Sequence, residues 1–256
     1  SGRTTLNGEG LQHQDGHSHI LSSTIPNCLS YDPAFAYEVA VIVKNGIKEM
    51  FVDQKNYFYY ITTINENYSH PEIPDGSESG IIKGMYKLID NENAQIRLLG
   101  SGAILREAIK AKELLEKFNI KAEVWSVTSF NLLRKDGMEV ERFNQLNPSK
   151  EPNPSYVEQC FSDSDIPVIA ATDYMRSYSE QIRPYIKSTF FTLGTDGYGR
   201  SDSRETLRDF FEVNSKSISR AASYALYKTK VISEDQIVDI YKTLKVDTTK
   251  PNPWEV

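Results

Sequence analysis

The sequence predicts an α/β fold in which helices alternate with the strands of a mostly parallel sheet. Short apolar runs rich in β-branched and aromatic residues alternate with longer segments whose apolar residues recur at helical spacing. The composition, with 39% hydrophobic and 25% charged residues, is typical of a chain that builds a packed core. Because 256 residues exceed one ordinary domain, we expect two unequal domains.

Overall charge and cysteine content argue against several classes of protein. A net charge of −6 argues against a nucleic-acid partner. No apolar run approaches the roughly 20 residues that span a bilayer, and the first residues lack the pattern of a secretory signal. We therefore expect no membrane partner and a cytoplasmic location. Cys28, in a predicted strand, and Cys160, in a predicted helix, provide no disulfide framework, and we interpret both as core thiols.

Residues 8–19 gather three of the four histidines, His13, His17 and His19, around Asp15 in a glycine-rich stretch. Imidazole titrates near neutrality and can donate, accept or bind a metal. Three interpretations remain open: a polar loop that satisfies its own hydrogen bonds, a zinc site, or a loop of donors that faces a substrate. The spacing matches no established zinc motif, and Gly16 disfavours a helix that would align His13 with His17.

The elements that follow this stretch are predicted from apolar runs and cap residues. Residues 25–31 form a strand, and Asp32 and Pro33 are typical of a helix start, with Asp as the cap. The helix extends to about Met50 and carries an apolar stripe that we expect to pack against the core. Residues 57–64 predict a buried strand. Residues 65–80 are rich in proline, glycine and acidic residues and predict a linker, and His70 within it is expected to be solvated. The stripe comprises Ala36, Val39, Ala40, Val43 and Ile47.

The second half of the chain contains the main sheet and its covering helices. Strands are predicted at residues 85–90, 95–100, 122–128, 166–172 and 188–193. Helices are predicted at residues 103–118, 204–211, 215–228 and 233–244. A further helix is predicted after Thr128, with an interruption at Asp136 and Gly137. Ser233 and Gln236 occupy the capping-box positions of the last helix.

Two glycine turns in this half are candidate anion sites. Residues 100–102 (GSG) turn from a strand into a helix and could cradle a phosphate, but they lack the full dinucleotide spacing, so a plain tight connection is favoured. In residues 194–203, Arg200 could bind a carboxylate or phosphate, or it could pair with Asp202 to fix the turn.

Several stretches together resemble the homodimeric pyruvate dehydrogenase E1 component, a thiamine-diphosphate enzyme of the transketolase superfamily. The resemblance begins in the histidine-rich stretch, recurs in the middle of the chain and ends in the second glycine turn, so it covers nearly all 256 residues. The matching stretches are residues 3–13 (RTTLNGEGLQH), 15–19 (DGHSH), 25–28 (IPNC), 126–130 (SVTSF), 172–175 (TDYM) and 194–205 (GTDGYGRSDSRE).

This resemblance implies the domain organisation. Residues 1–68 correspond to the C-terminal part of a pyrimidine-binding transketolase-type domain, residues 69–80 to a linker, and residues 81–256 to a complete transketolase C-terminal-like domain. Family members are much longer, so we expect this chain to be a C-terminal fragment. The family's diphosphate and magnesium motif and its pyrimidine-activating glutamate are absent from this sequence. We therefore assign no cofactor-binding or metal-binding residue here, although the full enzyme uses thiamine diphosphate and Mg²⁺.

The same resemblance implies the reaction and its site. The full enzyme decarboxylates pyruvate and reductively acetylates the lipoyl group of the E2 dihydrolipoyl acetyltransferase, and it works as a homodimer. His13, His17 and His19 are implied as donors to the substrate carboxylate or to the oxygen of the tetrahedral adduct and as proton shuttles. Asp15 would orient an imidazole or fix the turn. Asp173, which follows a strand, is expected to have a scaffold role and not a catalytic one.

Two alternatives from other classes remain. The chain could be a non-catalytic module that dimerises and supports another polypeptide. It could also be a metal-dependent hydrolase that binds zinc through the three histidines, which we rank below both other interpretations.

Overall fold

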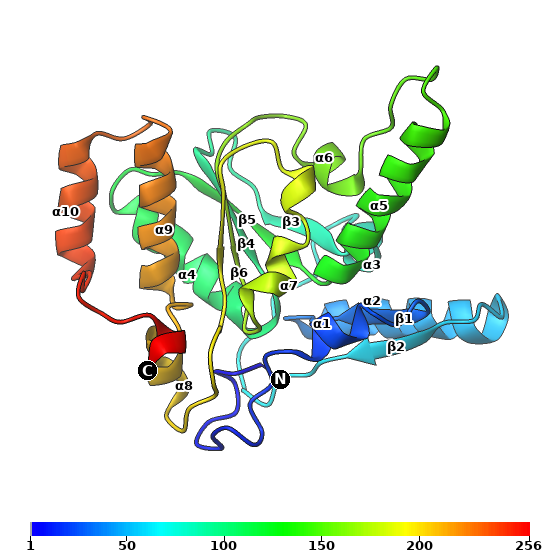
Figure 1. The fold of residues 1–256 in the computed structure, drawn as a ribbon, viewed down its shortest axis with the longest axis horizontal. Helices are drawn as coiled ribbons and strands as arrows, with labels where there is room; N and C mark the ends of the chain where they lie inside the picture. The colour runs from blue at the N-terminus through cyan, green and yellow to red at the C-terminus, as the bar shows by residue number, and fades with distance from the viewer. Residues whose placement is uncertain (1) are drawn as a thin grey trace.

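The computed structural model describes residues 2–256 and contains one large and one small sheet (Figure 1). In the large sheet β3 runs antiparallel to β5, and the remaining neighbours are parallel, which confirms the predicted α/β fold with a mostly parallel sheet. All five strands lie within or next to their predicted ranges. In spatial order they are β3 (Met85–Ile89), β5 (Ala122–Val127), β4 (Ile96–Gly100), β6 (Val168–Ala171) and β7 (Phe190–Leu193).

Helices cover both faces of the large sheet, as Figure 1 shows, with α4, α9 and α10 on one side and α5, α6 and α7 on the other. Successive side chains of a strand point to opposite faces of the sheet, so each strand contributes to the core on both faces. In β4, Ile96 and Leu98 belong to one core cluster, whereas Leu99 belongs to the other. The helical segments of this half are α3 (Glu78–Lys83), η2 (Gly102–Ile104), α4 (Leu105–Glu116), α5 (Phe130–Leu146), α6 (Tyr156–Cys160), α7 (Arg176–Glu180), η3 (Arg183–Tyr185), α8 (Arg204–Phe210), α9 (Ser215–Lys228), α10 (Glu234–Leu244) and η4 (Pro253–Glu255).

The first part of the chain forms an arm beside this domain, seen in blue and cyan in Figure 1. It contains α1 (Ser18–Ser22), β1 (Cys28–Tyr31), α2 (Ala36–Ile47), the π-helical turn η1 (Lys48–Val52) and β2 (Phe58–Ile61). β1 and β2 pair in parallel as a separate two-stranded sheet. The prediction that β2 is buried under helices is wrong, because Phe58 and Tyr60 on one of its faces are exposed.

The start of α2 also differs from the prediction. Its cap residue is Phe35, and the carboxylate of Glu38 accepts hydrogen bonds from the backbone N–H groups of Ala34 (2.5 Å) and Phe35 (3.0 Å). The free amides at this end are therefore satisfied by a residue inside the helix. Asp32, the predicted cap, is buried and used elsewhere.

The apolar stripe of α2 does not pack into the core as predicted. Ala36 and Ala40 are exposed, and Val43 and Ile47 are 42% and 54% exposed. The buried positions of the helix are Glu38, Ile42 and Gly46. The stripe continues past the end of α2 through Phe51 and Val52, both more than 70% exposed. It is thus an uncovered apolar face in the described chain.

α5 is not interrupted at Asp136 and Gly137, contrary to the prediction. Gly137 lies against the ring of Tyr185, and a Cβ atom built there would come within 2.2 Å of that ring. The glycine therefore permits close packing and does not end the helix.

Three further predictions concern a helix cap, the two cysteines and membrane-spanning helices. Ser233 and Gln236 form the predicted capping box of α10. Both cysteines are half-buried and unpaired, so the core-thiol interpretation holds only in part. No helix formed by residues 2–256 has the length and apolar composition needed to cross a bilayer.

Candidate functional site

Residues 2–19, here called the histidine loop, lie along the carboxyl ends of the parallel strands of the large sheet. Both ends of the loop are fastened to the segment that follows β6. Near the start, the backbone N–H of Arg3 donates to the carbonyl of Asp173 (3.0 Å). Near the end, the carbonyl of Gly16 accepts from the backbone N–H of Met175 (3.1 Å). The loop therefore leaves and rejoins the chain at the same segment, just after β6.

Asp173 is the centre of the first attachment. Its carboxylate accepts from the backbone N–H and the hydroxyl of Thr4 (3.0 and 2.6 Å) and from the hydroxyl of Thr5 (2.6 Å). Its carbonyl also accepts from the hydroxyl of Thr195 (2.9 Å). Asp173 is fully buried, and burial raises the pKa of its carboxyl although the threonine hydrogen bonds act in the opposite direction.

A second attachment joins the middle of the histidine loop to the turn before α8. The amide of Gln14 donates to the carbonyls of Leu6 (3.3 Å) and Arg200 (2.5 Å) and accepts from the backbone N–H of Arg200 (2.7 Å). The backbone N–H of Gly8 donates to the carbonyl of Asp202 (3.0 Å). Gln14 is thus a bridge between segments that are 186 residues apart.

The expected pairing of Arg200 with Asp202 does not occur. The guanidinium of Arg200 donates to the carbonyl of Val256, and the carboxylate of Asp202 accepts from the backbone N–H of Ser203 (2.6 Å). The turn is held by the Gln14 amide and by the backbone hydrogen bond from Gly8 to Asp202, and not by an Arg200 to Asp202 pair.

The three histidines have different surroundings. His13 is exposed, and its Nε2 lies 3.8 Å from the carboxylate of Glu9. His17 is also exposed, with its Nε2 3.4 Å from a guanidinium nitrogen of Arg3. His19 is buried, so the loop presents two imidazoles to its surroundings and turns the third inward.

Asp15 fixes the turn between these histidines. Its carboxylate accepts from the backbone N–H groups of His17 (2.9 Å) and Ser18 (3.0 Å), and so holds the turn that leads into α1, whose cap residue is His17. Partial burial acts to raise the pKa of Asp15, but hydrogen bonds from Ser18 and His17 outweigh it and lower the pKa.

His19 lies in the contact between the two parts of the chain. Its Nδ1 is 2.5 Å from the hydroxyl of Ser30, and its Nε2 is 3.2 Å from the hydroxyl of Thr62. The ring stacks on Tyr178 and meets Tyr174 edge-on. Burial lowers the pKa of His19 to about 3, so the imidazole is neutral at physiological pH.

Thr62 connects His19 to Asp32. The threonine hydroxyl donates to the Asp32 carboxylate (2.7 Å), whose other oxygen is buried and has no hydrogen-bond partner within residues 2–256. Burial raises the pKa of Asp32 to about 7, because the charged form loses its hydration.

Asp32 also fills the glycine turn at residues 100–102. The Asp32 carbonyl accepts from the backbone N–H of Gly102 (3.0 Å), and a Cβ at Gly102 would come within 2.4 Å of the Asp32 carboxylate. Gly102 has φ +48°, which favours glycine. β4 ends at Gly100 and η2 begins at Gly102, so the turn is the tight connection between strand and helix that the sequence favoured.

Comparisons with known proteins match both parts of the chain. A model of the family "Pyruvate dehydrogenase E1 component middle domain" matches residues 1–71, and one of the "Transketolase-like TK C-terminal domain" matches residues 84–214. The chain is 52% identical over 260 residues to the pyruvate dehydrogenase E1 component of Pseudomonas aeruginosa and 50% identical over 258 residues to that of Escherichia coli K12.

The chain belongs to the pyruvate dehydrogenase E1 family. The alignments cover 100% and 99% of this chain but only 30% and 29% of those two relatives. The chain therefore spans less than a third of their length.

Solved structures agree on the fold of this E1 family member. A transketolase mutant from Pichia stipitis in complex with fructose-6-phosphate matches with a TM-score of 0.66 at 18% identity and covers 90% of this chain and 29% of its own. Transketolase from Campylobacter jejuni matches with a TM-score of 0.62 at 17% identity, covering 86% and 30%.

Potential metal ligands are dispersed in the described part of this E1 chain. No group of three His, Cys, Asp or Glu side chains among residues 2–256 is arranged to hold a metal ion. Asp15 and Asp196, the two aspartates that precede a glycine in the family-like stretches, already have partners: Asp15 accepts from the backbone N–H groups of His17 and Ser18, and Asp196 lies 3.5 Å from Nε of Arg176. The residues present therefore do not fit a magnesium diphosphate.

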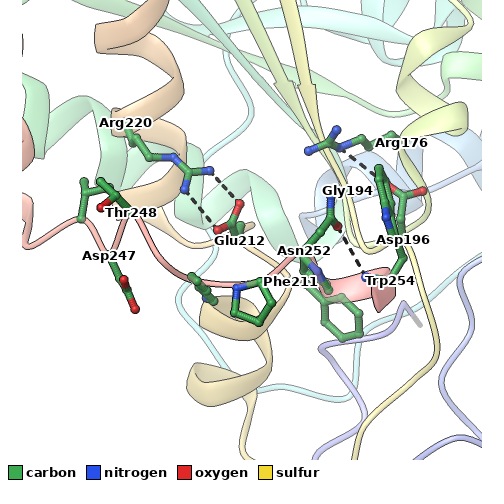
Figure 2. A pocket seen from close by; sticks show the side chains of 14 residues that line it. Arg176, Gly194, Asp196, Phe211, Glu212, Arg220, Asp247, Thr248, Asn252 and Trp254 are labelled. Atoms are coloured by element: carbon green, nitrogen blue, oxygen red, sulfur yellow. Dashed lines mark hydrogen bonds and ion pairs between the residues drawn. The ribbon is translucent and has the colours of Figure 1, made fainter. Parts of the chain in front are cut away.

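One polar cavity was not anticipated from the sequence. Figure 2 shows this cavity of about 310 Å³ between the C-terminal segment and the end of α8, with Arg220 paired to Glu212 across its wall (2.8 and 3.1 Å). Arg176 and Asp196 form its other side. Arg220 pairs with Glu212 and Arg176 lies 3.5 Å from Asp196, so four of the charged side chains that line the cavity are paired within it.

Sequence reasoning identified the histidine loop but not the residues that hold it. Gln14, Thr62 and Asp32 acquire their roles through partners 30 or more residues away. Asp173 carried a local signal, its position directly after a strand end, where α/β folds place functional groups.

Proposed function

We propose that this chain is the C-terminal part of a pyruvate dehydrogenase E1 polypeptide. Residues 1–68 would complete its pyrimidine-binding domain, residues 69–80 would form a linker, and residues 81–256 would form its C-terminal domain. The observation that carries this proposal is identity near 50% along the whole chain to proteins of that name. The complete polypeptide would decarboxylate pyruvate with thiamine diphosphate and acetylate the lipoyl group of a dihydrolipoyl acetyltransferase in the cytoplasm.

Within this reaction His13 and His17 are the donors. Both are exposed on a loop that is fastened at its ends and middle, so they can meet a substrate that approaches the carboxyl edge of the sheet. Protonated or neutral, an imidazole N–H can bind the pyruvate carboxylate or the oxygen that gains charge during decarboxylation. Asp15 holds the turn that separates them. His19 would have a structural role in the reaction and would not donate to the substrate, because its buried ring holds the first turn of α1 in place.

The chain alone would be inactive. Thiamine diphosphate and Mg²⁺ would be held by polypeptide outside residues 2–256, since of the two candidate aspartates here Asp15 accepts backbone hydrogen bonds and Asp196 pairs with Arg176. These residues would supply orientation and hydrogen bonds to a substrate whose electron sink is provided elsewhere.

The protein would act as a homodimer. The uncovered stripe on α2 supports this, because Val43, Ile47 and Phe51 are the kind of apolar surface that a stable protein covers. The dihydrolipoyl acetyltransferase would bind the complete assembly.

The experiment joins this chain to the N-terminal remainder of the Pseudomonas aeruginosa relative. The 256-residue chain with pyruvate, thiamine diphosphate and Mg²⁺ should release no carbon dioxide, whereas the joined protein should. In the joined protein, His13→Ala should lower kcat on the order of a hundredfold, and Asp136→Asn, far from the loop, should not. A joined protein that folds and turns over normally with both His13→Ala and His17→Ala would support the non-catalytic module instead. Stoichiometric zinc bound by the isolated chain would support the hydrolase.

A further inference from the structure

Three hydrogen-bond donors at the start of the histidine loop converge on one buried carboxylate. The backbone N–H and the hydroxyl of Thr4 meet one oxygen of Asp173, and the hydroxyl of Thr5 meets the other. All three groups are buried. Because the donors lie where water does not reach, they have no replacement partner if the carboxylate is removed.

Asp173 is attached directly to the large sheet, whereas the histidine loop that it binds has little regular structure of its own. It follows β6, a central strand of the large sheet, by two residues. The carbonyl of Asp173 bonds Thr195 in the segment after β7. The histidine loop, in contrast, contains no strand and reaches a helix only at Ser18. The geometry of the loop start is thus set by the sheet and transmitted by the carboxylate.

We infer that Asp173 is a positioning residue for the proposed reaction, which acts through Thr4 and Thr5 to hold the histidine loop in the conformation that presents His13 and His17. This inference rests on the proposed function of the loop. The carboxylate does not meet the substrate itself, because Asp173 is 1% exposed and both its oxygens face the loop threonines.

Two variants test this at the two ends of the contact. Asp173→Ala removes all three acceptor contacts. Thr5→Val keeps the shape of the loop residue but removes one donor, so it tests the same contact if Asp173→Ala folds poorly. Asp173→Asn is the conservative variant, because its amide oxygen can still accept from Thr4 and its NH₂ group can donate to the Thr5 hydroxyl. Asp136→Ala is the matched control, since this carboxylate accepts a backbone N–H bond from Tyr156 (2.6 Å) away from the loop.

The first readout is hydrogen exchange in the 256-residue chain. In Asp173→Ala, and to a lesser extent in Thr5→Val, the amides of Thr4, Gly8 and Gln14 should exchange about tenfold faster or more, while those of β4 and β5 keep the wild-type rate. Asp173→Asn should restore most of the protection, and Asp136→Ala should leave the loop unchanged. Wild-type protection of these three amides in both Asp173→Ala and Thr5→Val would overturn the inference.

The second readout is steady-state kinetics in the joined polypeptide. Misplaced imidazoles should lower kcat on the order of tenfold to a hundredfold in Asp173→Ala, with KM changed less than kcat, and Asp173→Asn should recover most of the loss. Faster loop exchange with unchanged kcat would overturn the positioning role. The proposed function fails separately, because it is His13→Ala, and not any Asp173 variant, that decides whether the loop takes part in the reaction.

Discussion

His19→Gln and Asp32→Asn should change the pH dependence of folding stability in opposite directions. Both side chains are buried, and Thr62 bonds both of them. Burial lowers the pKa of His19 from 6.5 to about 3 and raises the pKa of Asp32 from 3.8 to about 7. Between pH 4.5 and 6.0 unfolding therefore adds a proton to His19 and releases one from Asp32, so the net uptake of the pair is close to zero.

The size of each effect follows from proton linkage. A group whose pKa is lowered in the folded state stabilises the fold more as the pH rises toward its unfolded value, whereas a group whose pKa is raised stabilises the fold less as the pH rises. Each proton difference changes the free energy of unfolding by about 1.4 kcal/mol per pH unit. Integrated between pH 4.5 and 6.0 with the four pKa values above, His19 adds about 2 kcal/mol of stability and Asp32 removes about 2 kcal/mol.

The assay is urea unfolding of the 256-residue chain at pH 4.5, 5.0, 5.5 and 6.0 and constant ionic strength. Relative to wild type, His19→Gln should lose about 2 kcal/mol of unfolding free energy across this range, and Asp32→Asn should gain about the same. The double variant should run parallel to wild type, which makes it the internal control. If the free energy of His19→Gln stays a constant amount below wild type at all four pH values, His19 does not change its protonation on unfolding and the reasoning is refuted.

Three further predictions concern packing, charge and assembly. Gly137→Ala should lower the free energy of unfolding by about 1 to 3 kcal/mol, because the added methyl group would overlap the Tyr185 ring; an unchanged urea midpoint would show that α5 can move aside. Glu66→Gln should lower the thermal midpoint, since the Glu66 carboxylate lies within 3.8 Å of three guanidinium groups. That loss should shrink in 1 M NaCl, where the arginines repel each other less, and a loss independent of salt would contradict an electrostatic cause. Ile47→Glu on the α2 stripe should shift the mass measured by light scattering from dimer to monomer, whereas Lys48→Glu beside it should not; a dimer that survives Ile47→Glu would place the interface elsewhere.

The strands of the second domain could be predicted because their signal is local. β4, for example, is a mainly apolar strand covered on both faces, and its Ile96, Leu98 and Leu99 are all fully buried. The capping box at Ser233 was likewise contained in four consecutive residues. Such elements depend on composition and spacing within a short window, so the sequence alone was sufficient for them.

The arm was harder to predict because its apolar residues do not indicate which surface covers them. The spacing of Val43 and Ile47 is the same whether the partner is the chain's own core or another surface, and only the structure shows both exposed. Helix α1 of the arm spans five residues, too few for a periodic pattern, and the same holds for α7 beside the large sheet. The burial of His19 depends on Thr62, which is 43 residues away, so no local pattern could separate it from His13 and His17.

The first part of the chain lies at the edge of the large sheet where α/β folds usually bind ligands. In an open α/β sheet, ligands bind outside the carboxyl ends of the strands, at the point where the strand order reverses. Here β4 lies between β5 and β6, so that point lies beside Ser101 and Thr172, whose hydroxyls are 3.0 Å apart. Asp32 contacts Gly102 next to this point, and Thr4 and Thr5 of the histidine loop bind Asp173 beside it. The first part of the chain therefore occupies the edge of the sheet where other α/β proteins bind a ligand. These contacts hold in place the segment that carries the candidate donors His13 and His17.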